Sequence, residues 1–248
     1  MPHCEKAEQL SALHLSRLMW VAQKIEHENE MIETVIKIGG SIGQSHKLAH
    51  LMMQVSELAG RYNIMVVPGG GAFADAIRYY DRQFGLDTDA SHWMAILAMD
   101  QYGHLLASLA PNIELAQSLA DAHKALSQGR IPVLLTYNLL FQTDELPRSW
   151  DVTSDSIAAW VAGICKAKQL ILLKSVDGLF TDNPTEHTTA KLLDKISLEK
   201  LAICGGVDPY ISTVLKKNEV ETWVINGNYP DRLIQLLDTG DTLGTHIP

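Results

Sequence analysis

Lys37 is the side chain whose surroundings in the sequence most clearly indicate chemistry. It lies in the apolar run VIKI over 35–38, two residues before a glycine pair, Gly39 and Gly40, which Ser41 follows. An unpaired ammonium group buried in a strand costs free energy, so its charge requires an anion. We interpret Lys37 as a fixed cation for a phosphoryl group in transfer. The alternative is a lysine on an edge strand whose ammonium group extends into solvent.

A second glycine-rich turn follows another apolar run. Gly69, Gly70 and Gly71 come after Pro68, at the end of the run over 64–67. Glycines let backbone N–H groups approach a phosphate closely, especially where a helix begins. Each turn alone is equally explained by a tight connection that needs positive φ. Two such turns at one edge of a sheet could bind the two ends of a row of phosphates.

Two other nucleotide-binding patterns compete with this interpretation. Gly69-x-Gly71-x-x-Ala74 satisfies a relaxed dinucleotide fingerprint, and Asp87 or Asp89 lies near the distance expected of the ribose-binding carboxylate. Three consecutive glycines after a proline are atypical of that fingerprint, and both aspartates fall in a polar turn rather than at a strand end. The P-loop pattern GxxxxGK followed by Ser or Thr does not occur in the sequence.

The segment DVTSDS over 151–156 opens a predicted helix with short oxygen-bearing side chains. A Ser or Thr N-cap and an acidic residue in the first turn explain part of this pattern. Capping does not require all five polar residues. We predict that Asp155 orients Lys37 or a second cation, and that Asp151 and Thr153 face the acceptor of a transferred group.

The predicted elements place these residues at the ends of strands. From residue 34 onward β-branched runs alternate with helical patterns, which predicts an α/β fold of parallel strands joined by crossover helices. Strands are predicted over 34–38, 64–67, 131–135, 170–173 and 222–225, and helices over 46–59, 72–82, 89–109, 112–128, from 154, near 210–217 and from 230. A separate amphipathic helix is predicted over 1–32. It packs on the body or on a partner subunit, or it is absent because translation starts at Met31.

The composition is that of an ordinary globular protein. The chain has 248 residues, of which 46% are hydrophobic and 20% charged, and this excludes disordered, fibrous and membrane classes. The formal net charge of -9 predicts no nucleic acid or anionic lipid partner. Cys4, Cys165 and Cys204 lie far apart without CxxC spacing, so we expect free thiols in a reducing compartment. Without an 18-residue apolar run or a signal-peptide pattern, we expect a cytoplasmic protein that binds no membrane.

Five motifs, taken in order, resemble the amino acid kinase family. They are VIKIGGS at 35–41, VVPGGG at 66–71, DVTSDS at 151–156, LLKSVDGLFTDNP at 172–184 and VINGNYPDRL at 224–233. The resemblance implies a three-layer αβα sandwich around a mainly parallel sheet. It implies one kinase domain over 33–248, whose N-terminal half binds the acceptor and whose C-terminal half binds ATP, and a homo-oligomer of two or more subunits. Mg²⁺ would bind chiefly to the ATP oxygens, because no clustered carboxylates predict a protein metal site.

The resemblance also implies roles for matching residues. Lys37 would neutralise charge on the transferring phosphoryl group, and Asp155 would organise the cations. Phosphate and acceptor would contact Gly39, Gly40, Ser41, Gly69, Gly70, Gly71, Asp151 and Thr153. ATP would contact Lys174, Ser175, Asp177, Gly178, Phe180, Asp182 and Pro184, with Phe180 against the base and Asp182 near the ribose.

Further signals resemble the branch of the family that phosphorylates aminomethylfuran phosphate in the biosynthesis of methanofuran-type one-carbon carriers. They are SH at 91–92 before MD at 99–100, SW at 149–150 before TSDS, and NG at 226–227 with a following proline. Such an acceptor offers an ammonium group and a phosphate. His92 and Asp100 lie near one helix face, and we predict that His92 binds the phosphate and Asp100 the ammonium group. The alternative is helix packing plus a surface carboxylate, and Arg148 is another candidate phosphate ligand.

One departure from the family pattern concerns a second lysine. Several relatives place a phosphate-binding lysine after a glycine-containing turn, where this chain has Tyr210. Lys216 and Lys217 follow on the same predicted helix, and Lys216 is predicted as the substitute, although a solvated helix end explains both equally well. Other acceptors in the family are nucleoside monophosphates and carboxylates. The fold also serves proteins that bind ATP without turnover, and the missing lysine keeps that alternative open.

Overall fold

The computed structural model describes residues 31–44, 47–202 and 204–248, so the predicted helix over 1–32 lies almost wholly outside the described residues. The strands are β1 (Thr34–Ile38), β2 (Ile64–Pro68), β3 (Ile113–Ala116), β4 (Ile131–Leu134), β5 (Gln169–Lys174), β6 (Glu221–Asn226) and β7 (Gly244–Ile247). The helices are η1 (Ile42–Gln44), α2 (Lys47–Glu57), α3 (Gly71–Phe84), α4 (Thr88–Ser108), α5 (Leu119–Ser127), α6 (Thr136–Thr143), α7 (Ser154–Ile164), α8 (Leu198–Leu201), α9 (Ile211–Asn218) and α10 (Pro230–Thr239).

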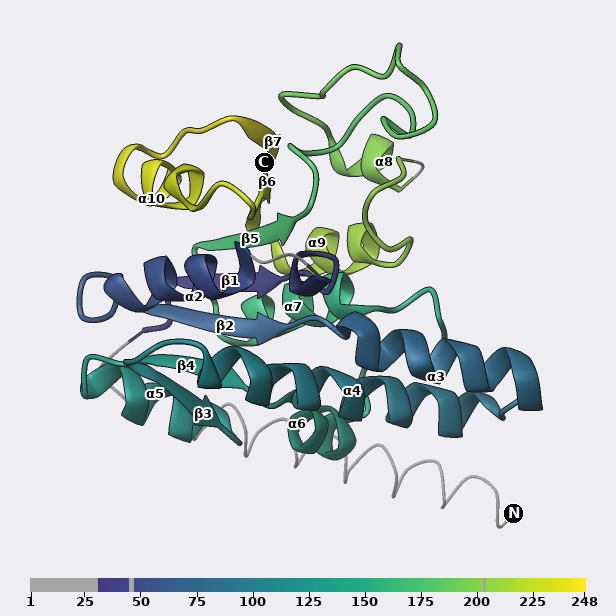
Figure 1. Cartoon of the computed structure of the whole chain (residues 1–248), viewed down its shortest axis with the longest axis horizontal. Helices are drawn as coiled ribbons and strands as arrows, with labels where there is room; N and C mark the ends of the chain where they lie inside the picture. The colour runs from purple at the N-terminus through teal and green to yellow at the C-terminus, as the bar shows by residue number, and fades with distance from the viewer. Residues whose placement is uncertain (1–30, 45–46, 203) are drawn as a thin grey trace, which may run out of the picture.

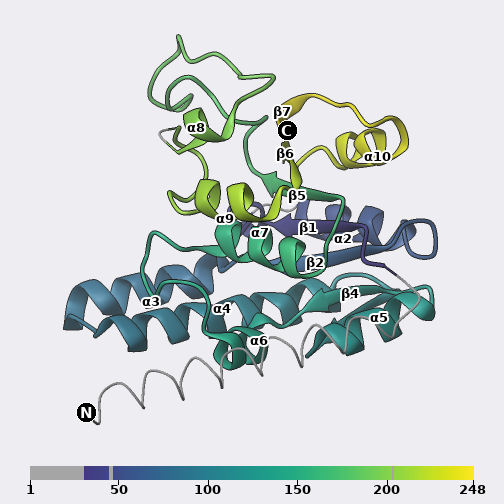
Figure 2. The same ribbon diagram turned by 180° about the vertical axis from the view of Figure 1, so that it is seen from behind.

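The strands form one seven-stranded sheet in the order β3-β4-β2-β1-β5-β6-β7. Every pairing is parallel except that of β6 with β7, which is antiparallel. Helix α2 lies in front of the strands in Figure 1, and α7 lies in front of them when the molecule is turned around in Figure 2. The predicted three-layer αβα sandwich around a mainly parallel sheet is confirmed.

The two faces of β1 explain the direction in which Lys37 points. Val35 belongs to the core cluster that contains α7, whereas Ile36 and Ile38 belong to the cluster that contains α2. Side chains alternate between the faces of a strand, so Lys37 shares the face of Val35 and extends toward α7.

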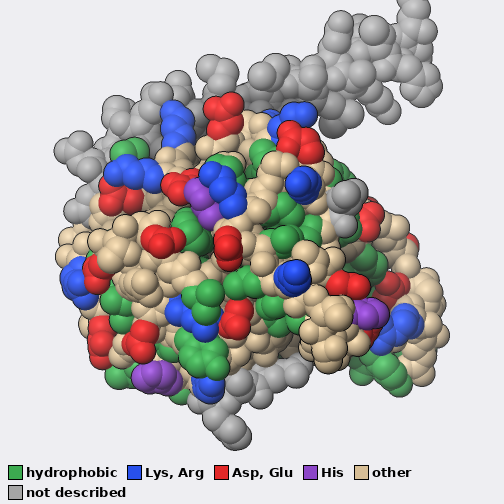
Figure 3. All heavy atoms as spheres, turned by 90° about the horizontal axis from the view of Figure 1, so that it is seen from above, with side chains coloured by type: hydrophobic (Ala, Val, Ile, Leu, Met, Phe, Trp, Pro, Cys, Tyr) green, Lys and Arg blue, Asp and Glu red, His purple; other side chains and the backbone are tan. Residues whose placement is uncertain are grey.

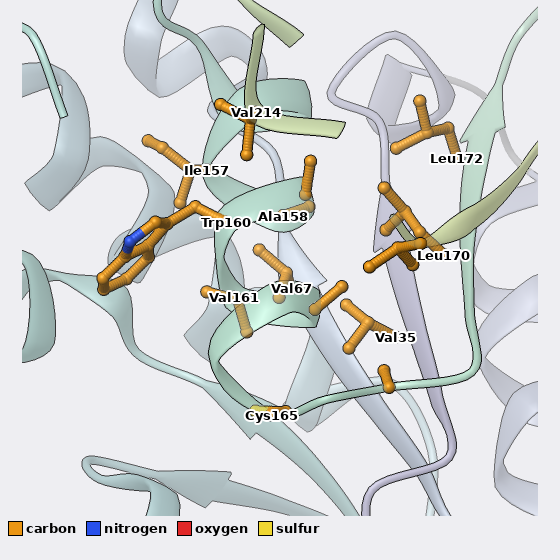
Figure 4. Close-up of a cluster of buried hydrophobic side chains, with 14 of the residues drawn as sticks. Val35, Val67, Ile157, Ala158, Trp160, Val161, Cys165, Leu170, Leu172 and Val214 are labelled. Atoms are coloured by element: carbon orange, nitrogen blue, oxygen red, sulfur yellow. The ribbon is translucent and has the colours of Figure 1, made fainter. Parts of the chain in front are cut away.

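The core on the α7 face is built from alternate positions of the central strands. Figure 4 shows Val35, Val67, Leu170 and Leu172 beside α7, with which they share one core cluster. Helix α7 begins at a polar segment and continues with apolar residues such as Ile157, Ala158, Trp160 and Val161, all buried. Burial of this face stabilises α7 by about 25 cal/mol per Å² of apolar surface removed from water. It thereby fixes the position of the first turn, where Asp155 lies.

Several elements differ from the sequence prediction, among them the short helices η1 and α8, which had none. The predicted helix over 112–128 is instead strand β3 followed by α5, whose N-cap is Ser118. Strand β3 is a four-residue edge strand, too short to show a period of two against the alanine-rich helix that follows. Helix α6 and the antiparallel edge strand β7 had no prediction. Helix α6 follows β4 directly, and its first N–H groups are capped by a residue far away in the sequence, which local patterns cannot reveal.

Candidate active site

The site lies at the carboxyl edge of the sheet, where β1 is flanked by β2 and β5. The chain runs from β1 to β2 on one side of β1 and later adds β5 on the other side. In open α/β sheets ligands bind at such a switch point. The register places Ile38 beside both Pro68 and Leu173, so the two glycine turns and Lys174 follow three adjacent strands. The sequence prediction that both turns share one sheet edge is therefore confirmed.

The two glycine turns contact each other through their backbones. A Cβ atom on Gly40 would lie 2.2 Å from the backbone nitrogen of Gly71, which has φ +54°. A larger residue at either position would separate the turns or strain the chain. Helix α3 begins at Gly71, and the N–H groups of a first helical turn have no partner within the helix. They form a donor group suited to an anion.

Asp155 bridges the ammonium groups of two lysines. Its Oδ1 lies 2.8 Å from the Nζ of Lys37, and its Oδ2 accepts a hydrogen bond of 2.6 Å from the Nζ of Lys174. The side chains of Lys37 and Asp155 are only 6% and 5% exposed, whereas that of Lys174 is 16% exposed. Two positive charges share one carboxylate, so the cluster retains a net positive charge beside the glycine turns.

Burial and charge act against each other on the pKa values of this cluster. Burial alone would raise the pKa of Asp155, but the two nearby ammonium groups hold it well below its ordinary value. Burial lowers the pKa of Lys37, and Lys174 adds to this effect, whereas Asp155 opposes it. Asp155 is therefore ionised at neutral pH, as its role of holding two cations requires.

Asp208 is a functional residue that the sequence analysis missed. Its carboxylate accepts hydrogen bonds from the backbone N–H groups of Thr153, Ser156 and Ile211 at 3.0, 2.9 and 3.0 Å. It also accepts from the hydroxyl groups of Thr153 and Ser156. It thus joins the N-termini of α7 and α9 and fixes the turn that carries Asp155. An aspartate and a proline directly before a predicted helix are the signal that could have revealed it.

A cavity of about 730 Å³ extends from this cluster between α3, α4 and the segment 148–157. Its wall includes much of the predicted site. The predicted residues that line it are Lys37, Gly39, Gly40, Ser41, Gly70, Gly71, His92, Thr153, Asp155 and Lys174. The remaining wall is partly apolar, with Ile96, Met99 and Val152 among its residues.

Two predicted contact residues lie beside this cavity without lining it. The backbone nitrogen of Gly69 donates to the carbonyl oxygen of Ile38 at 2.9 Å, so Gly69 links the second glycine turn to the end of β1. Asp151 is exposed, and its carbonyl oxygen accepts from the backbone nitrogen of Tyr210. The hydroxyl of Thr153, predicted to face the acceptor, instead donates to Asp208.

Asp100, predicted to bind an ammonium group, is not brought to the cavity. Its carboxylate accepts from the backbone N–H groups of Thr136 at 2.7 Å and Tyr137 at 3.4 Å, and so caps α6. Burial raises the pKa of Asp100 to about 6, although these N–H groups oppose the rise. Asp100 and His92, eight residues apart on α4, face different neighbours, and only His92 lines the cavity, so ammonium binding by Asp100 stays a prediction that the cavity does not support.

Lys216, predicted as the second catalytic lysine, also lies elsewhere. It is exposed in the last turn of α9, near Glu199 of α8. The helix begins at the site, beside Asp208, and extends away from it. Tyr210, at the position of the family lysine, packs against the core on the α7 face.

Apart from Lys174, the residues predicted to bind ATP lie outside the cavity wall. Asp177 accepts from the side chains of Asn226 and Arg232, which joins this loop to β6 and α10. Gly178 is buried, while Ser175 and Asp182 are exposed. Phe180 is half-buried, and Pro184 is exposed farther along the loop. Of the seven, only Lys174 lines the cavity, and a nucleotide role for the other six stays a prediction.

Arg148 lines the cavity, but its charge is already compensated. Its guanidinium group contacts Asp89 at 2.6 Å and Asp144 at 2.8 Å and lies over the ring of Trp93. Asp89 therefore has a partner other than a ribose, and Asp87 caps α4. These contacts argue against the dinucleotide-binding alternative.

The model of the amino acid kinase family matches residues 33–228. The chain belongs to the amino acid kinase family. It is an ATP-dependent phosphotransferase, as the family and its kinase relatives show. Membership confirms the resemblance predicted from the five motifs and excludes the dinucleotide-binding alternative.

Two kinases are similar to this chain over most of their length. The chain is 29% identical to [5-(aminomethyl)furan-3-yl]methyl phosphate kinase of Methanocaldococcus jannaschii, over 86% of this chain and 96% of the relative. It is 26% identical to uridylate kinase of Methanosarcina barkeri, over 82% of this chain and 91% of the relative.

Solved structures of other kinases share the fold. Uridylate kinase of Archaeoglobus fulgidus superimposes with a TM-score of 0.70 at 22% identity, and covers 87% of this chain and 100% of its own. Isopentenyl phosphate kinase of T. acidophilum superimposes with a TM-score of 0.59 at 19% identity, with the same coverage of both chains.

No helix within 31–44, 47–202 and 204–248 combines the length and apolar character needed to cross a bilayer. Across this described part of the chain, no three His, Cys, Asp or Glu side chains are grouped so that they could hold a metal ion.

Proposed function

We propose that this kinase transfers the γ-phosphoryl group of ATP to the phosphate of an aminomethylfuran phosphate and so makes a furan diphosphate for a methanofuran-type one-carbon carrier. The observation that carries the proposal is the cluster of Lys37, Asp155 and two glycine turns at the head of a cavity. The similarity to the M. jannaschii kinase supports this choice of acceptor.

The proposed reaction needs no protein nucleophile. An oxygen of the acceptor phosphate forms a bond to the γ-phosphorus, the bond from that phosphorus to the β,γ-bridging oxygen breaks, and ADP leaves with that oxygen. The acceptor oxygen is already anionic at neutral pH, so no general base has to remove a proton. Positioning and charge neutralisation therefore supply most of the catalysis.

The chain's own groups suit these two tasks. The ammonium group of Lys37 lies 3.7 Å from the point where a Cβ of Gly39 would stand, directly beneath the first turn. Fixed cations and N–H donors stabilise charge that develops in a transition state, and removing one such donor costs about 10²–10³-fold in kcat. Mg²⁺ bound to ATP would neutralise further charge on the phosphates. The ammonium groups and glycine N–H groups of the chain are suited to bind the phosphate oxygens of such a Mg-ATP complex.

The acceptor would occupy the cavity with its phosphate toward the glycine turns. His92 lines the wall, and burial, followed by the charge of Arg148, lowers its pKa. A neutral imidazole can donate one hydrogen bond to a phosphate.

Besides Asp155, the described carboxylates in the wall are Asp75 and Asp81, both on α3. Asp75 also pairs with Arg78 at 2.9 Å, and Asp81 accepts a hydrogen bond of 2.7 Å from the indole N–H of Trp150. We assign the ammonium group of the acceptor to this pair, in which these contacts use one oxygen of each carboxylate.

This assignment predicts that removing these carboxylates changes KM for the acceptor and not KM for ATP. Replacing Asp75 and Asp81 with Asn, singly and together, should raise KM for the aminomethyl acceptor about tenfold or more in at least one variant and leave KM for ATP unchanged. The matched control is the hydroxymethyl analogue of the acceptor, for which KM should not change. If KM for the aminomethyl acceptor stays at the wild-type value in all three variants, the ammonium group binds elsewhere.

The proposed function is tested by an acceptor panel. The purified protein with Mg-ATP and aminomethylfuran phosphate should yield ADP and the furan diphosphate in equal amounts by mass spectrometry. Uridylate and glutamate are the comparison acceptors, because uridylate kinases and a glutamate 5-kinase are relatives. Faster turnover of uridylate, or a hydroxylamine-trappable acyl phosphate from glutamate, would contradict the proposed acceptor.

A further inference from the structure

Lys174 lines the cavity, whereas the other predicted ATP-binding residues of the loop that it begins do not. The sequence groups it with the ATP-binding residues over 174–184, yet its ammonium group turns back to Asp155. It is the last residue of β5, and the preceding Leu173 accepts a hydrogen bond of 2.9 Å from the backbone nitrogen of Gly39. Lys174 therefore stands beside the first glycine turn, on the strand next to the one that carries Lys37.

Four described lysine and arginine side chains line the cavity, and the two arginines already have carboxylate partners. They are Lys37, Arg78, Arg148 and Lys174 among the residues that the structure describes. Arg78 pairs with Asp75 at 2.9 Å and lies over the ring of Trp150. Arg148 has two carboxylate partners.

Of the cationic side chains within 31–44, 47–202 and 204–248, Lys37 and Lys174 are the two that contact the central carboxylate of Asp155. Each takes a different oxygen, at 2.8 and 2.6 Å. The carboxylate can fully compensate one of the two ammonium charges, so the other remains available to an anion. Lys174 is the more exposed of the pair and opens toward the cavity.

We propose that Lys174 is a catalytic residue that contacts the transferring phosphoryl group. This inference rests on the proposed kinase function but not on the identity of the acceptor. In the transfer, the ammonium group of Lys174 neutralises charge on the equatorial oxygens of the γ-phosphoryl group opposite Lys37, and Asp155 keeps the two cations apart. No proton moves to or from Lys174.

The test compares ligands with and without the third phosphate. Variants Lys174→Met and Lys174→Gln remove the charge, and Lys124→Met, an exposed lysine of α5, is the matched control. Dissociation constants for ADP and for β,γ-imido-ATP are measured with Mg²⁺ by calorimetry, and kcat is measured with the best acceptor. We expect both Lys174 variants to bind the imido-ATP at least tenfold more weakly, bind ADP within twofold of wild type, and lose about 100-fold or more in kcat.

Other roles of Lys174 would give other affinities for ADP and imido-ATP. Equal weakening of ADP and imido-ATP would assign Lys174 to the nucleotide moiety, as the sequence grouping implies, and would overturn the proposal. Unchanged affinities and kcat would also overturn it. If Lys174→Met lowers the melting temperature strongly, Lys174→Gln, which keeps a donor for Asp155, carries the comparison. Failure of the wild type to phosphorylate aminomethylfuran phosphate would refute the proposed acceptor alone, because the two dissociation constants need no acceptor.

Discussion

At the scale of single residues, the site depends on one carboxylate that stabilises the buried ammonium group of Lys37 and the partly buried one of Lys174. A lysine in a central strand costs free energy unless an anion meets it, and Asp155 is that anion. The sequence predicted the contact between Lys37 and Asp155 because each residue lacked a sufficient structural explanation alone. It grouped Lys174 with the ATP-binding residues and did not predict its contact with Asp155, because a lysine at a strand end beside a polar loop is typical of a solvated residue.

Lys37→Met tests the first half of this centre. The variant should lose about 10²–10³-fold in kcat, since it removes a fixed cation from the transferring group. The fold should persist, because Asp155 keeps its ion pair with Lys174. Steady-state kinetics and a thermal melt measure the two effects, with Lys124→Met as the matched control. Turnover within threefold of wild type would remove Lys37 from the mechanism.

At the scale of secondary-structure elements, strands buried on both faces were predictable and long-range caps were not. The runs over 34–38, 64–67 and 170–173 became β1, β2 and β5, since parallel central strands are continuous apolar runs. The edge strands β3 and β7 are four residues long and give weak patterns. Asp208 caps α7, which lies about fifty residues earlier in the chain, and Asp100 caps α6, which lies 36 residues later and had no prediction.

Asp208→Ala should destabilise the protein through two helices at once. The substitution leaves several N–H and hydroxyl donors at the starts of α7 and α9 without their acceptor. Unsatisfied buried donors cost about 1–3 kcal/mol each before relaxation, so a loss of about 3 kcal/mol in the free energy of unfolding is expected. Urea unfolding measures it. A loss below about 1 kcal/mol would show that water replaces the carboxylate.

The cap of α6 predicts a pH dependence of stability. The pKa of Asp100 is about 6 in the folded protein, above the ordinary value of an aspartate in an unfolded chain. Between about pH 4 and pH 6 the folded state therefore binds more protons than the unfolded state, and this contribution to stability falls as pH rises. Asp100→Asn keeps an acceptor for Thr136 but cannot ionise.

The Asp100→Asn variant should therefore gain stability relative to wild type as pH rises from 4 to 6 and show a constant difference above pH 7. Urea unfolding across this range measures the difference, with Asp241→Asn, an exposed residue that follows α10, as control. A difference that stays constant from pH 4 to 7 would mean that Asp100 titrates normally.

At the scale of the whole molecule, the sheet order places the acceptor cavity beside one set of strands and the loop over 174–184 beside the other. The helices α3 and α4 extend beyond the sheet edge on the cavity side, and β6, β7 and α10 lie on the opposite side in Figure 1. We propose that these are the acceptor-binding and ATP-binding halves. Acidic and basic side chains are interspersed over the face in Figure 3, which offers no broad basic surface.

The family resemblance further predicts a homo-oligomer. Phe73, Tyr79, Tyr80 and Phe84 of α3 are exposed, and clustered exposed aromatic side chains are typical of interaction surfaces. Sedimentation velocity of the full chain at micromolar concentration should therefore give a dimer or a larger assembly. A single species at the 27.4 kDa monomer mass would contradict this expectation.

Transfer of a phosphoryl group to an acceptor phosphate at the centre of Lys37 and Asp155 can be followed by ³¹P NMR of the running reaction. With the wild type, the singlet of the acceptor monophosphate should disappear as two coupled diphosphate doublets appear beside those of ADP, and Lys37→Met should leave the acceptor singlet unchanged. ATP consumption without loss of that singlet, or the same doublets at the wild-type rate from Lys37→Met, would contradict the account.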